Sequence, residues 1–237
     1  MAPAIPVVDS TSVPSVTMEQ MREVDRIMIE DLHIELIQMM ENAGRNLARL
    51  AVARFAPARV LVLAGSGGNG GGGLVAARHL ANHGVGVEVV LGKDPGELGD
   101  VPARQLDAVA RMGVPIVAEP SPADLYIDAL IGYSLTGNPW GRIAELIEWL
   151  GGQPEPILAL DTPSGLDVTT GEPGTPSVTA TATLTLAAPK TGLLETEVVG
   201  ELYLGDISVP PSVYDVFGAS MPVDLFAEQA VVRLSPG

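Results

Sequence analysis

Cysteine is absent from this chain of 237 residues, and lysine is almost absent. A chain without thiols forms no disulfide, no thiolate zinc site and no cysteine nucleophile. Lys93 and Lys190 are the only lysines among 13 basic residues, and 29 acidic residues bring the formal net charge to −16. Such a surface repels the phosphates of nucleic acids and anionic membranes. We therefore expect neither a nucleic acid nor a membrane as a partner.

The sequence also lacks the apolar segments that direct a chain to a membrane. No hydrophobic run approaches the length of a membrane span, and residues 1–15 lack the basic start and long apolar centre of a signal peptide. Together with the missing cysteines, this favours a cytoplasmic location. The acidic, lysine-poor composition raises the further hypothesis of a salt-rich cytoplasm. Hydrophobic residues make up 46% of the chain, which is enough for one sizeable core, so we expect one compact unit.

The N-terminal part predicts two helices. Thr17 and Gln20 have the spacing of a capping box, so a helix is expected to begin there. Apolar residues then recur at spacings of three and four, in a stripe that we expect to face the core: Met18, Met21, Val24 and Met28. Residues 36–55 predict a second helix. Gly44 inside it costs about 1 kcal/mol relative to alanine, which indicates a close packing contact.

From residue 59 onward, short apolar runs alternate with helical stretches. The runs that predict strands are 59–65, 86–92, 114–119, 125–132 and 156–165. Helices are expected to begin near Leu74, Val101 and Trp140. Continuous apolar strands separated by helices form a parallel sheet that is covered on both faces. The fold class is therefore α/β, with three layers, a mostly parallel central sheet and the N-terminal helices. Two later runs, 180–189 and 200–210, are expected to extend the sheet at one edge.

A glycine-rich segment follows the first strand of this sheet. Seven of the nine residues from Gly65 to Gly73 are glycine. Ligands of such sheets bind beyond the carboxyl ends of the strands, which makes the segment a candidate binding loop. Backbone N–H groups that no Cβ atom shields, next to a helix N-terminus, favour a phosphate as the bound group.

Three alternative roles for the glycines carry less weight. Gly65, Gly67 and Gly70 satisfy G-x-G-x-x-G, but the match to a dinucleotide-dependent dehydrogenase is weak because no acidic residue is well placed after the second strand. A Walker A loop is excluded, since no Lys-Ser or Lys-Thr follows. A turn that only packs a helix against a strand rarely needs seven glycines.

Polar side chains gather at the ends of neighbouring strands. Asp128 and Asp161 each follow an apolar run, and Ser164 comes shortly after the second. Together with Asn69 of the glycine segment, Asp128 and Ser164 offer an amide, a carboxylate and a hydroxyl oxygen, which suit a hard cation and suit zinc poorly. Each of them alone is equally well explained by a turn or cap role. Lys190, after a later strand, is compatible with a phosphate contact or with a solvated loop.

Several motifs, in this order, resemble one family. They are MREVDRIMIEDLHIELIQMMENAGRNLA at 21–48, GSGGNGGGGLVAARHL at 65–80, DALIGYSLTG at 128–137, LDTPSGLD at 160–167 and APKTG at 188–192. Over about 18–209 the chain resembles the YjeF N-terminal domain, the NAD(P)H-hydrate epimerase family. The resemblance implies a Rossmann-like fold, often dimeric, that interconverts the R and S epimers of hydrated NADH and NADPH (NADHX and NADPHX). We accordingly expect a tail over 1–16, a domain over 17–218, a tail over 219–237, a homodimer, and a separate dehydratase that acts downstream.

The resemblance also assigns the site residues by position. Asn69, Asp128 and Ser164 match a site for potassium or another monovalent cation. Asp161 matches the aspartate that contacts the nicotinamide hydrate, and it is our candidate for proton transfer. The residues that match the substrate-binding stretches, besides Asp161, are Gly68, Asn69, Gly70, Gly71, Gly72, Gly132, Tyr133, Ser134, Leu135, Thr136, Gly137 and Asn138.

The glycine segment departs from the family pattern at two positions. The family loop reads G-x-G-N-N-G-G-D-G, whereas Gly68 stands here for the first Asn and Gly72 for the Asp. A lost hydrogen bond to a ligand costs about 0.5–1.5 kcal/mol, and one that involves a charged group about 1.5–3 kcal/mol. The alternative to an epimerase is therefore a catalytically impaired nucleotide-binding or scaffold protein of the same family.

Overall fold

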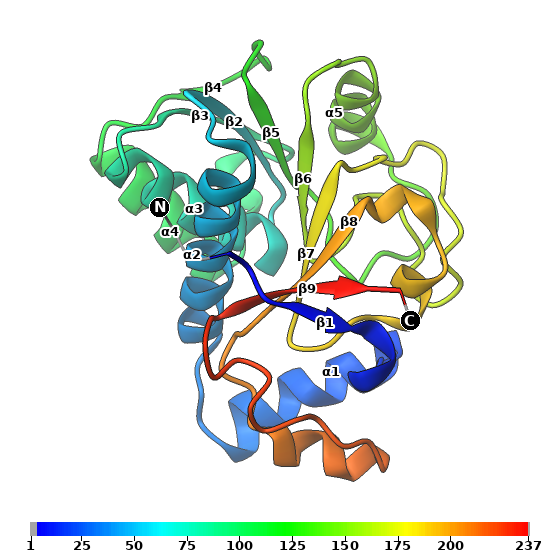
Figure 1. The fold of residues 1–237 in the computed structure, drawn as a ribbon. Coiled ribbons are helices and arrows are strands. Elements are labelled where there is room, and N and C mark those ends of the chain that lie inside the picture. The colour runs from blue at the N-terminus through cyan, green and yellow to red at the C-terminus, as the bar shows by residue number, and fades with distance from the viewer. Residues whose placement is uncertain (1–3, 237) are drawn as a thin grey trace.

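The computed structural model describes residues 4–236. Their strands form one mixed nine-stranded sheet (Figure 1). The strand order is β1-β9-β8-β7-β6-β5-β2-β3-β4. All neighbours are parallel except β8 and β9. The strands are β1(Val7–Asp9), β2(Arg59–Ala64), β3(Gly86–Leu91), β4(Ile116–Val117), β5(Leu125–Ala129), β6(Ile157–Leu160), β7(Ala182–Leu186), β8(Glu201–Gly205) and β9(Val231–Ser235). The α/β class with a mostly parallel sheet is thus confirmed.

Helices lie on both faces of the sheet and beneath it (Figure 1). The α-helices are α1(Met18–Arg26), α2(Leu36–Phe55), α3(Gly68–Asn82), α4(Asp100–Arg111) and α5(Gly141–Gly151). A π-helical turn, η2(Ile27–Asp31), continues α1, and short 3-10 helices are η1(Ser10–Ser12), η3(Pro95–Glu97), η4(Thr191–Leu194), η5(Glu197–Val199) and η6(Pro211–Phe217). No helix among residues 4–236 is long and apolar enough to cross a membrane.

Strand β2 shows how the sheet divides the core into two layers. Val60, Val62 and Ala64 belong to the cluster that packs against α2, α3 and α4. Leu61 and Leu63, which alternate with them, belong to the cluster around α5. All five are at most 2% exposed, so the strand is buried on both faces, as parallel strands between helices are.

The two N-terminal helices form as the sequence predicts. The Thr17 side chain accepts from the Gln20 N–H, and the Gln20 side chain accepts from the Thr17 N–H, so the capping box is present. Met21, Val24 and Met28 are buried. Gly44 lies where α2 crosses α3: a Cβ atom there would be 2.4 Å from Cβ of Val75. The predicted close contact at Gly44 is confirmed.

Helix α3 begins six residues earlier than predicted, at Gly68 instead of Leu74. Most of the glycine segment is therefore helix. Glycine disfavours helix in isolation, but packing outweighs that preference here. A Cβ atom on Gly73 would lie 2.6 Å from Cβ of Ala129. Because these glycines have no side chain, α3 packs closely against the sheet and α2.

Both segments expected to be tails contain strands of the sheet. Strand β1, within 1–16, pairs in parallel with β9, within 219–237, and β9 pairs antiparallel with β8. These strands have three and five residues, too few for a clear alternating pattern. At the opposite edge, β4 has only two residues of the predicted run 114–119.

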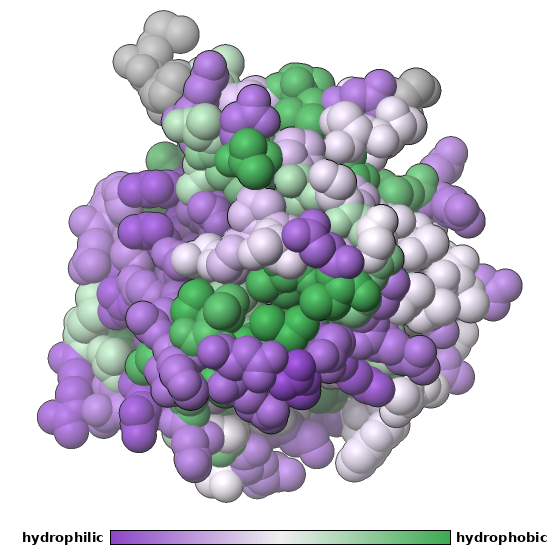
Figure 2. Space-filling model, turned by 90° about the horizontal axis from the view of Figure 1, so that it is seen from below, coloured by the Kyte–Doolittle hydropathy of each residue, from purple (hydrophilic) through white to green (hydrophobic). Residues whose placement is uncertain are grey.

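The surface is not uniformly polar. On the face seen from below in Figure 2, a hollowed strip of hydrophobic residues is bordered by hydrophilic ones. Smaller apolar areas lie elsewhere on the same face.

Candidate active site

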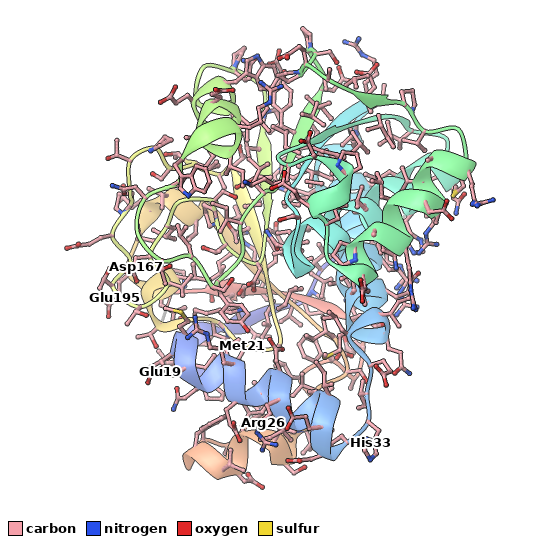
Figure 3. All side chains as sticks on the ribbon, turned by 180° about the vertical axis from the view of Figure 1, so that it is seen from behind. Glu19, Met21, Arg26, His33, Asp167 and Glu195 are labelled. Carbon is pink, nitrogen blue, oxygen red and sulfur yellow. The ribbon has the colours of Figure 1, made fainter. Side chains whose placement is uncertain are left out.

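A cavity of about 580 Å³ lies beyond the carboxyl ends of β2, β5 and β6. This is the position at which parallel α/β sheets bind ligands. The amino-terminal end of α3 and the loop after β5 form one wall, and α1 and α2 form another. Met21 of α1 lines the cavity, and Figure 3 shows this residue on the side of α1 that faces the rest of the molecule.

The first residues of α3 present free backbone donors to the cavity. The first i→i−4 bond of the helix runs from the Gly71 N–H to the Gly67 carbonyl, so the preceding N–H groups have no partner within the helix. Gly67 and Gly68 line the cavity, and a Cβ atom on either would meet nothing within 4 Å. This end of α3 can therefore hold an anion such as a phosphate.

The other glycines of the segment serve packing. A Cβ atom on Gly70 would lie 1.8 Å from the Gly65 carbonyl oxygen, and one on Gly72 would lie 2.7 Å from Cδ2 of Leu160. The expectation that packing has little weight is therefore wrong for much of the segment. Only Gly67 and Gly68 face the cavity without obstruction.

Asp161 sits directly after β6 and forms a buried ion pair with Lys190. The Asp161 side chain is 7% exposed and that of Lys190 is 1% exposed. The Lys190 ammonium also donates to Oγ1 of Thr185 at 3.2 Å and to the Leu186 carbonyl at 3.1 Å. The solvated-loop interpretation of Lys190 is therefore wrong: all three of its protons are used inside the protein.

The backbone fixes the Asp161 carboxylate toward the cavity. Asp161 has φ = 65°, in the left-handed region, which costs about 1–2 kcal/mol for a residue with a Cβ atom. The Asp161 N–H donates to the Leu184 carbonyl at 2.7 Å, and the Tyr133 N–H donates to Oδ2 at 3.3 Å. Strain of this kind persists where the surroundings hold a side chain in one place, and it is common in active sites.

Asp128 and Ser164 meet in a buried pair beside the cavity. Asp128 Oδ1 accepts from the Ser164 hydroxyl at 2.6 Å, and Oδ2 accepts from the Ser164 N–H at 2.7 Å. No basic side chain among residues 4–236 pairs with this carboxylate. Burial, only partly offset by these hydrogen bonds, raises the pKa of Asp128 to about 6.

Asn69 lines the cavity, which Asp128 and Ser164 do not, and it supplies an unsatisfied polar group there. Its Nδ2 is buried and has no hydrogen-bond partner among the described residues, and its side chain lies against Gly132. The same amide carries an oxygen, which is a hard donor of the kind that monovalent cations prefer. An uncompensated carboxylate and an unsatisfied amide fit a small cation bound next to them.

The cavity includes about half of the predicted substrate-binding residues. Those that line it are Gly68, Asn69, Gly72, Gly132, Tyr133, Ser134 and Asp161. Those that do not are Gly70, Gly71, Leu135, Thr136, Gly137 and Asn138. The Asn138 side chain instead accepts from the Thr175 N–H at 3.0 Å. Contact of any of these residues with a substrate stays a prediction.

Sequence reasoning missed Asp25, which projects from the last turn of α1 and lines the cavity. Its Oδ2 accepts from the Tyr133 hydroxyl at 2.5 Å. Burial raises the pKa of Asp25, and the Tyr133 bond offsets part of the rise. A signal was present: Asp25 follows Met21 by four residues and so shares the apolar face of the helix. A carboxylate on a core-facing stripe is costly to bury, so its presence there indicates a partner or a function.

The model of the family described as "YjeF-related protein N-terminus" matches residues 36–192. The chain belongs to the YjeF-related family. An NAD(P)H-hydrate epimerase of Dehalogenimonas lykanthroporepellens is 46% identical over 235 residues, which cover 96% of this chain and 95% of that protein. A bifunctional NAD(P)H-hydrate repair enzyme of Salinibacter ruber is 37% identical, over 85% of this chain and 42% of its own length.

The crystal structure of the yeast protein ynu0 has the same fold as this YjeF-related chain. The TM-score is 0.83, with 24% identity, over 94% of this chain and all of the yeast chain. The family model and the relative in Dehalogenimonas confirm the family assignment reached from the motifs. Asp25 lies outside the matched residues 36–192, so the family model does not draw attention to it.

Proposed function

We propose that this protein is an NAD(P)H-hydrate epimerase that interconverts the R and S epimers of NADHX and NADPHX. The supporting observation is the 46% identity to an NAD(P)H-hydrate epimerase along 96% of the chain. The cavity at the strand ends fits this assignment, because it combines backbone N–H groups that can hold a phosphate with buried acids. The reaction is an isomerisation and needs neither an oxidant nor a reductant.

In this proposal the two ends of the cavity have different tasks. The N–H groups at Gly68 and Asn69 bind a phosphate of the substrate, aided by the partial positive charge of the α3 N-terminus. Asp161 contacts the nicotinamide hydrate, held in place by Lys190 and the Tyr133 N–H. Apolar side chains of the wall, among them Leu160 and Ile131, keep water away from the ring.

Asn69, Asp128 and Ser164 would hold potassium or another monovalent cation. Bound there, the cation would compensate the buried Asp128 charge and fix the loop after β5 that carries Tyr133. The Ser164 hydroxyl accepts from the Ile131 N–H at 2.9 Å, so this group already links the Asp128 pair to that loop.

Gly72 favours a second candidate, a protein that binds the nucleotide but turns it over slowly. The place of the family aspartate is packed against Leu160, whose Cδ2 would lie 2.7 Å from a Cβ atom on Gly72, so the surroundings have adapted to glycine. The ligand would still bind through the backbone of α3. The two candidates bind the same ligand and differ only in the rate of epimerisation.

The test is the rate at which purified protein converts R-NADHX to S-NADHX, coupled to a dehydratase that accepts only the S epimer. We expect turnover well above the spontaneous rate, and faster turnover in potassium than in a bulky organic cation. Ligand binding without turnover would support the impaired alternative. Neither binding nor turnover would contradict both. A homodimer, a separate dehydratase partner and a cytoplasmic location are part of the proposal and await their own measurements.

A further inference from the structure

The two acids of the cavity differ in how many of their lone pairs are free. The Asp161 carboxylate receives the Lys190 ammonium and the Leu186 N–H on Oδ1, the latter at 3.3 Å, and the Tyr133 N–H on Oδ2. Taking up a proton would neutralise the partner of a buried cation, and an uncompensated buried charge is strongly destabilising. Asp161 is thus well placed to orient a substrate and badly placed to shuttle a proton.

Asp25 has the opposite character. Among residues 4–236, its carboxylate accepts one hydrogen bond, from the Tyr133 hydroxyl to Oδ2. Oδ1 is therefore available to a ligand in the cavity that Asp25 lines. No ion pair with a basic side chain of the described chain would have to break when Asp25 takes a proton.

Tyr133 connects the two acids. Its backbone N–H donates to Asp161 and its hydroxyl donates to Asp25, while its ring lies 5.8 Å from the Lys190 ammonium. Asp25 approaches from α1 and Asp161 from the sheet, so a ring bound between α1 and the strand ends meets both. Asp25 also lies two residues before Ile27, where a π-helical turn starts, and such a local irregularity often occurs at functional sites.

We propose that Asp25 is a proton-transfer residue of the epimerase reaction, that the Tyr133 hydroxyl positions it, and that the Asp161–Lys190 pair orients the substrate. This inference rests on the function proposed above. It assigns to Asp25 the acid–base role that sequence reasoning gave to Asp161.

The step balances without any co-reactant. In a nicotinamide hydrate, the carbon that bears the hydroxyl adjoins the ring nitrogen. Asp25 accepts the hydroxyl proton, the oxygen forms a C=O bond, and the C–N bond breaks with its electron pair passing to the nitrogen and its conjugated carboxamide. Rotation about the neighbouring C–C bond presents the other face of the carbonyl carbon. The nitrogen then re-forms the C–N bond, and Asp25 returns the proton to the oxygen.

The groups around Asp25 give this step a defined pH dependence. They are Tyr133 from the loop after β5, Lys190 and Asp161 from the strand ends, and Tyr214 from η6, while Arg22, one turn earlier on α1, acts on Tyr133. A base must be deprotonated to act, so kcat should rise with pH through the pKa of Asp25. The Tyr133 hydroxyl lowers that pKa, so its removal should move the rise to higher pH.

The decisive experiment measures kcat, KM and the pH profile of kcat with R-NADHX in Asp25→Asn and Tyr133→Phe. General acid–base groups contribute about 10²–10⁴-fold, so we expect kcat of Asp25→Asn to fall by at least about 100-fold with KM changed by less than about threefold. In Tyr133→Phe the ascending limb of the profile should shift to higher pH. Glu19→Gln removes a carboxylate from the outer side of the same helix (Figure 3) and should leave kcat unchanged.

Stability separates a chemical role from a structural one. The folded pKa of Asp25 lies above its ordinary value of 3.8, so the ionised side chain is penalised in the fold. This penalty is absent at low pH and complete above the folded pKa, so Asp25→Asn should unfold at the same or a higher temperature than wild type at pH 7. Asp25→Asn with wild-type kcat, or Tyr133→Phe with an unshifted profile, overturns this inference alone. A wild-type protein without turnover overturns the proposed function as well.

Discussion

Single glycines decide how closely α3 approaches its neighbours. A Cβ atom on Gly44 would lie 2.4 Å from Cβ of Val75 and 2.5 Å from the Gly72 carbonyl oxygen, and neither atom can move without its helix. Overpacking of this kind costs about 1–3 kcal/mol, so we expect Gly44→Ala to lower the free energy of unfolding by that amount. Gly68→Ala, with nothing within 4 Å, is the matched control and should cost nothing. Denaturant unfolding of both variants checks this, and equal stabilities would contradict it.

At Gly72 the obstacle is one flexible side chain. The nearest atom to a Cβ there is Cδ2 of Leu160, at 2.7 Å, with Ala43 next at 4.0 Å. We therefore expect Gly72→Asp to destabilise the protein, and Gly72→Ala, which adds the Cβ without the charge, to do so by a similar amount. Combined with Leu160→Ala, either change should cost less than the sum of the single effects, with a coupling of about 0.5–3 kcal/mol. Additive free energies of unfolding would show that Leu160 is not what excludes a side chain from this position.

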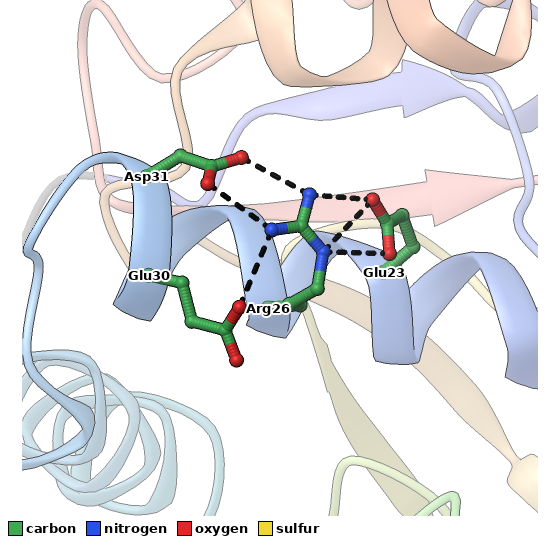
Figure 4. A network of polar contacts seen from close by, with 4 residues as sticks. All are labelled: Glu23, Arg26, Glu30 and Asp31. Atoms are coloured by element: carbon green, nitrogen blue, oxygen red, sulfur yellow. Dashed lines mark hydrogen bonds and ion pairs between the residues drawn. The ribbon is translucent and has the colours of Figure 1, made fainter.

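At the scale of the elements, a charge network holds the junction between α1 and η2. Arg26 bonds Glu23, Glu30 and Asp31, which lie on both sides of the junction (Figure 4). The hydrogen bonds to Glu23 and Asp31 are the main cause of the raised pKa of Arg26. The junction lies between Arg26 and Ile27, one residue beyond Asp25, so the network fixes the end of the helix that presents Asp25.

Replacing Arg26 should therefore matter more than replacing an arginine with a single partner. Among the described residues 4–236, Arg111 pairs only with Asp107, one turn away on α4, and its side chain is 77% exposed against 40% for Arg26. We expect Arg26→Ala to lower the melting temperature more than Arg111→Ala in dilute buffer. The difference should shrink at about 1 M salt, where the screening length is about 3 Å. Equal melting temperatures in dilute buffer would count against a structural role for the network.

Long, strongly patterned elements could be predicted from the sequence, and marginal ones could not. Helix α2 spans the predicted residues because its cap, apolar stripe and ending are all local signals. The start of α3 could not be predicted, since it depends on contacts of glycines with α2 and the sheet, far apart in sequence. Strands β1 and β9 exist because β1 pairs with β9 and β9 pairs with β8.

The candidate site shows the same division. Asp128, Asp161 and Ser164 could be found because strand ends mark them. The pairing of Asp161 with Lys190 joins residues 29 positions apart, and that of Asp25 with Tyr133 joins residues 108 positions apart. Neither pairing leaves a local pattern. Sequence reasoning located the pocket and assigned its proton chemistry to Asp161, the acid with the clearer motif, and that assignment stays a prediction beside our proposal for Asp25.

At the scale of the whole molecule, the net charge of −16 acts against the fold. Like charges repel more strongly in the compact state than in the unfolded chain, and salt screens this repulsion. We expect the melting temperature to rise as monovalent salt increases from about 0.05 M to about 1 M, with most of the rise below about 0.3 M, where the screening length changes most. Thermal unfolding across this series checks the prediction. An unchanged melting temperature would also remove the argument for a salt-rich cytoplasm.

One measurement tests the central claim most directly. It is the initial rate of R-NADHX epimerisation by the wild-type protein, compared with the spontaneous rate in the same buffer and with Asp161→Asn, which loses the partner of Lys190. The account predicts a wild-type rate well above the spontaneous one and a large loss in Asp161→Asn. A wild-type rate equal to the spontaneous one would contradict it and would leave a nucleotide-binding protein on the fold of an enzyme.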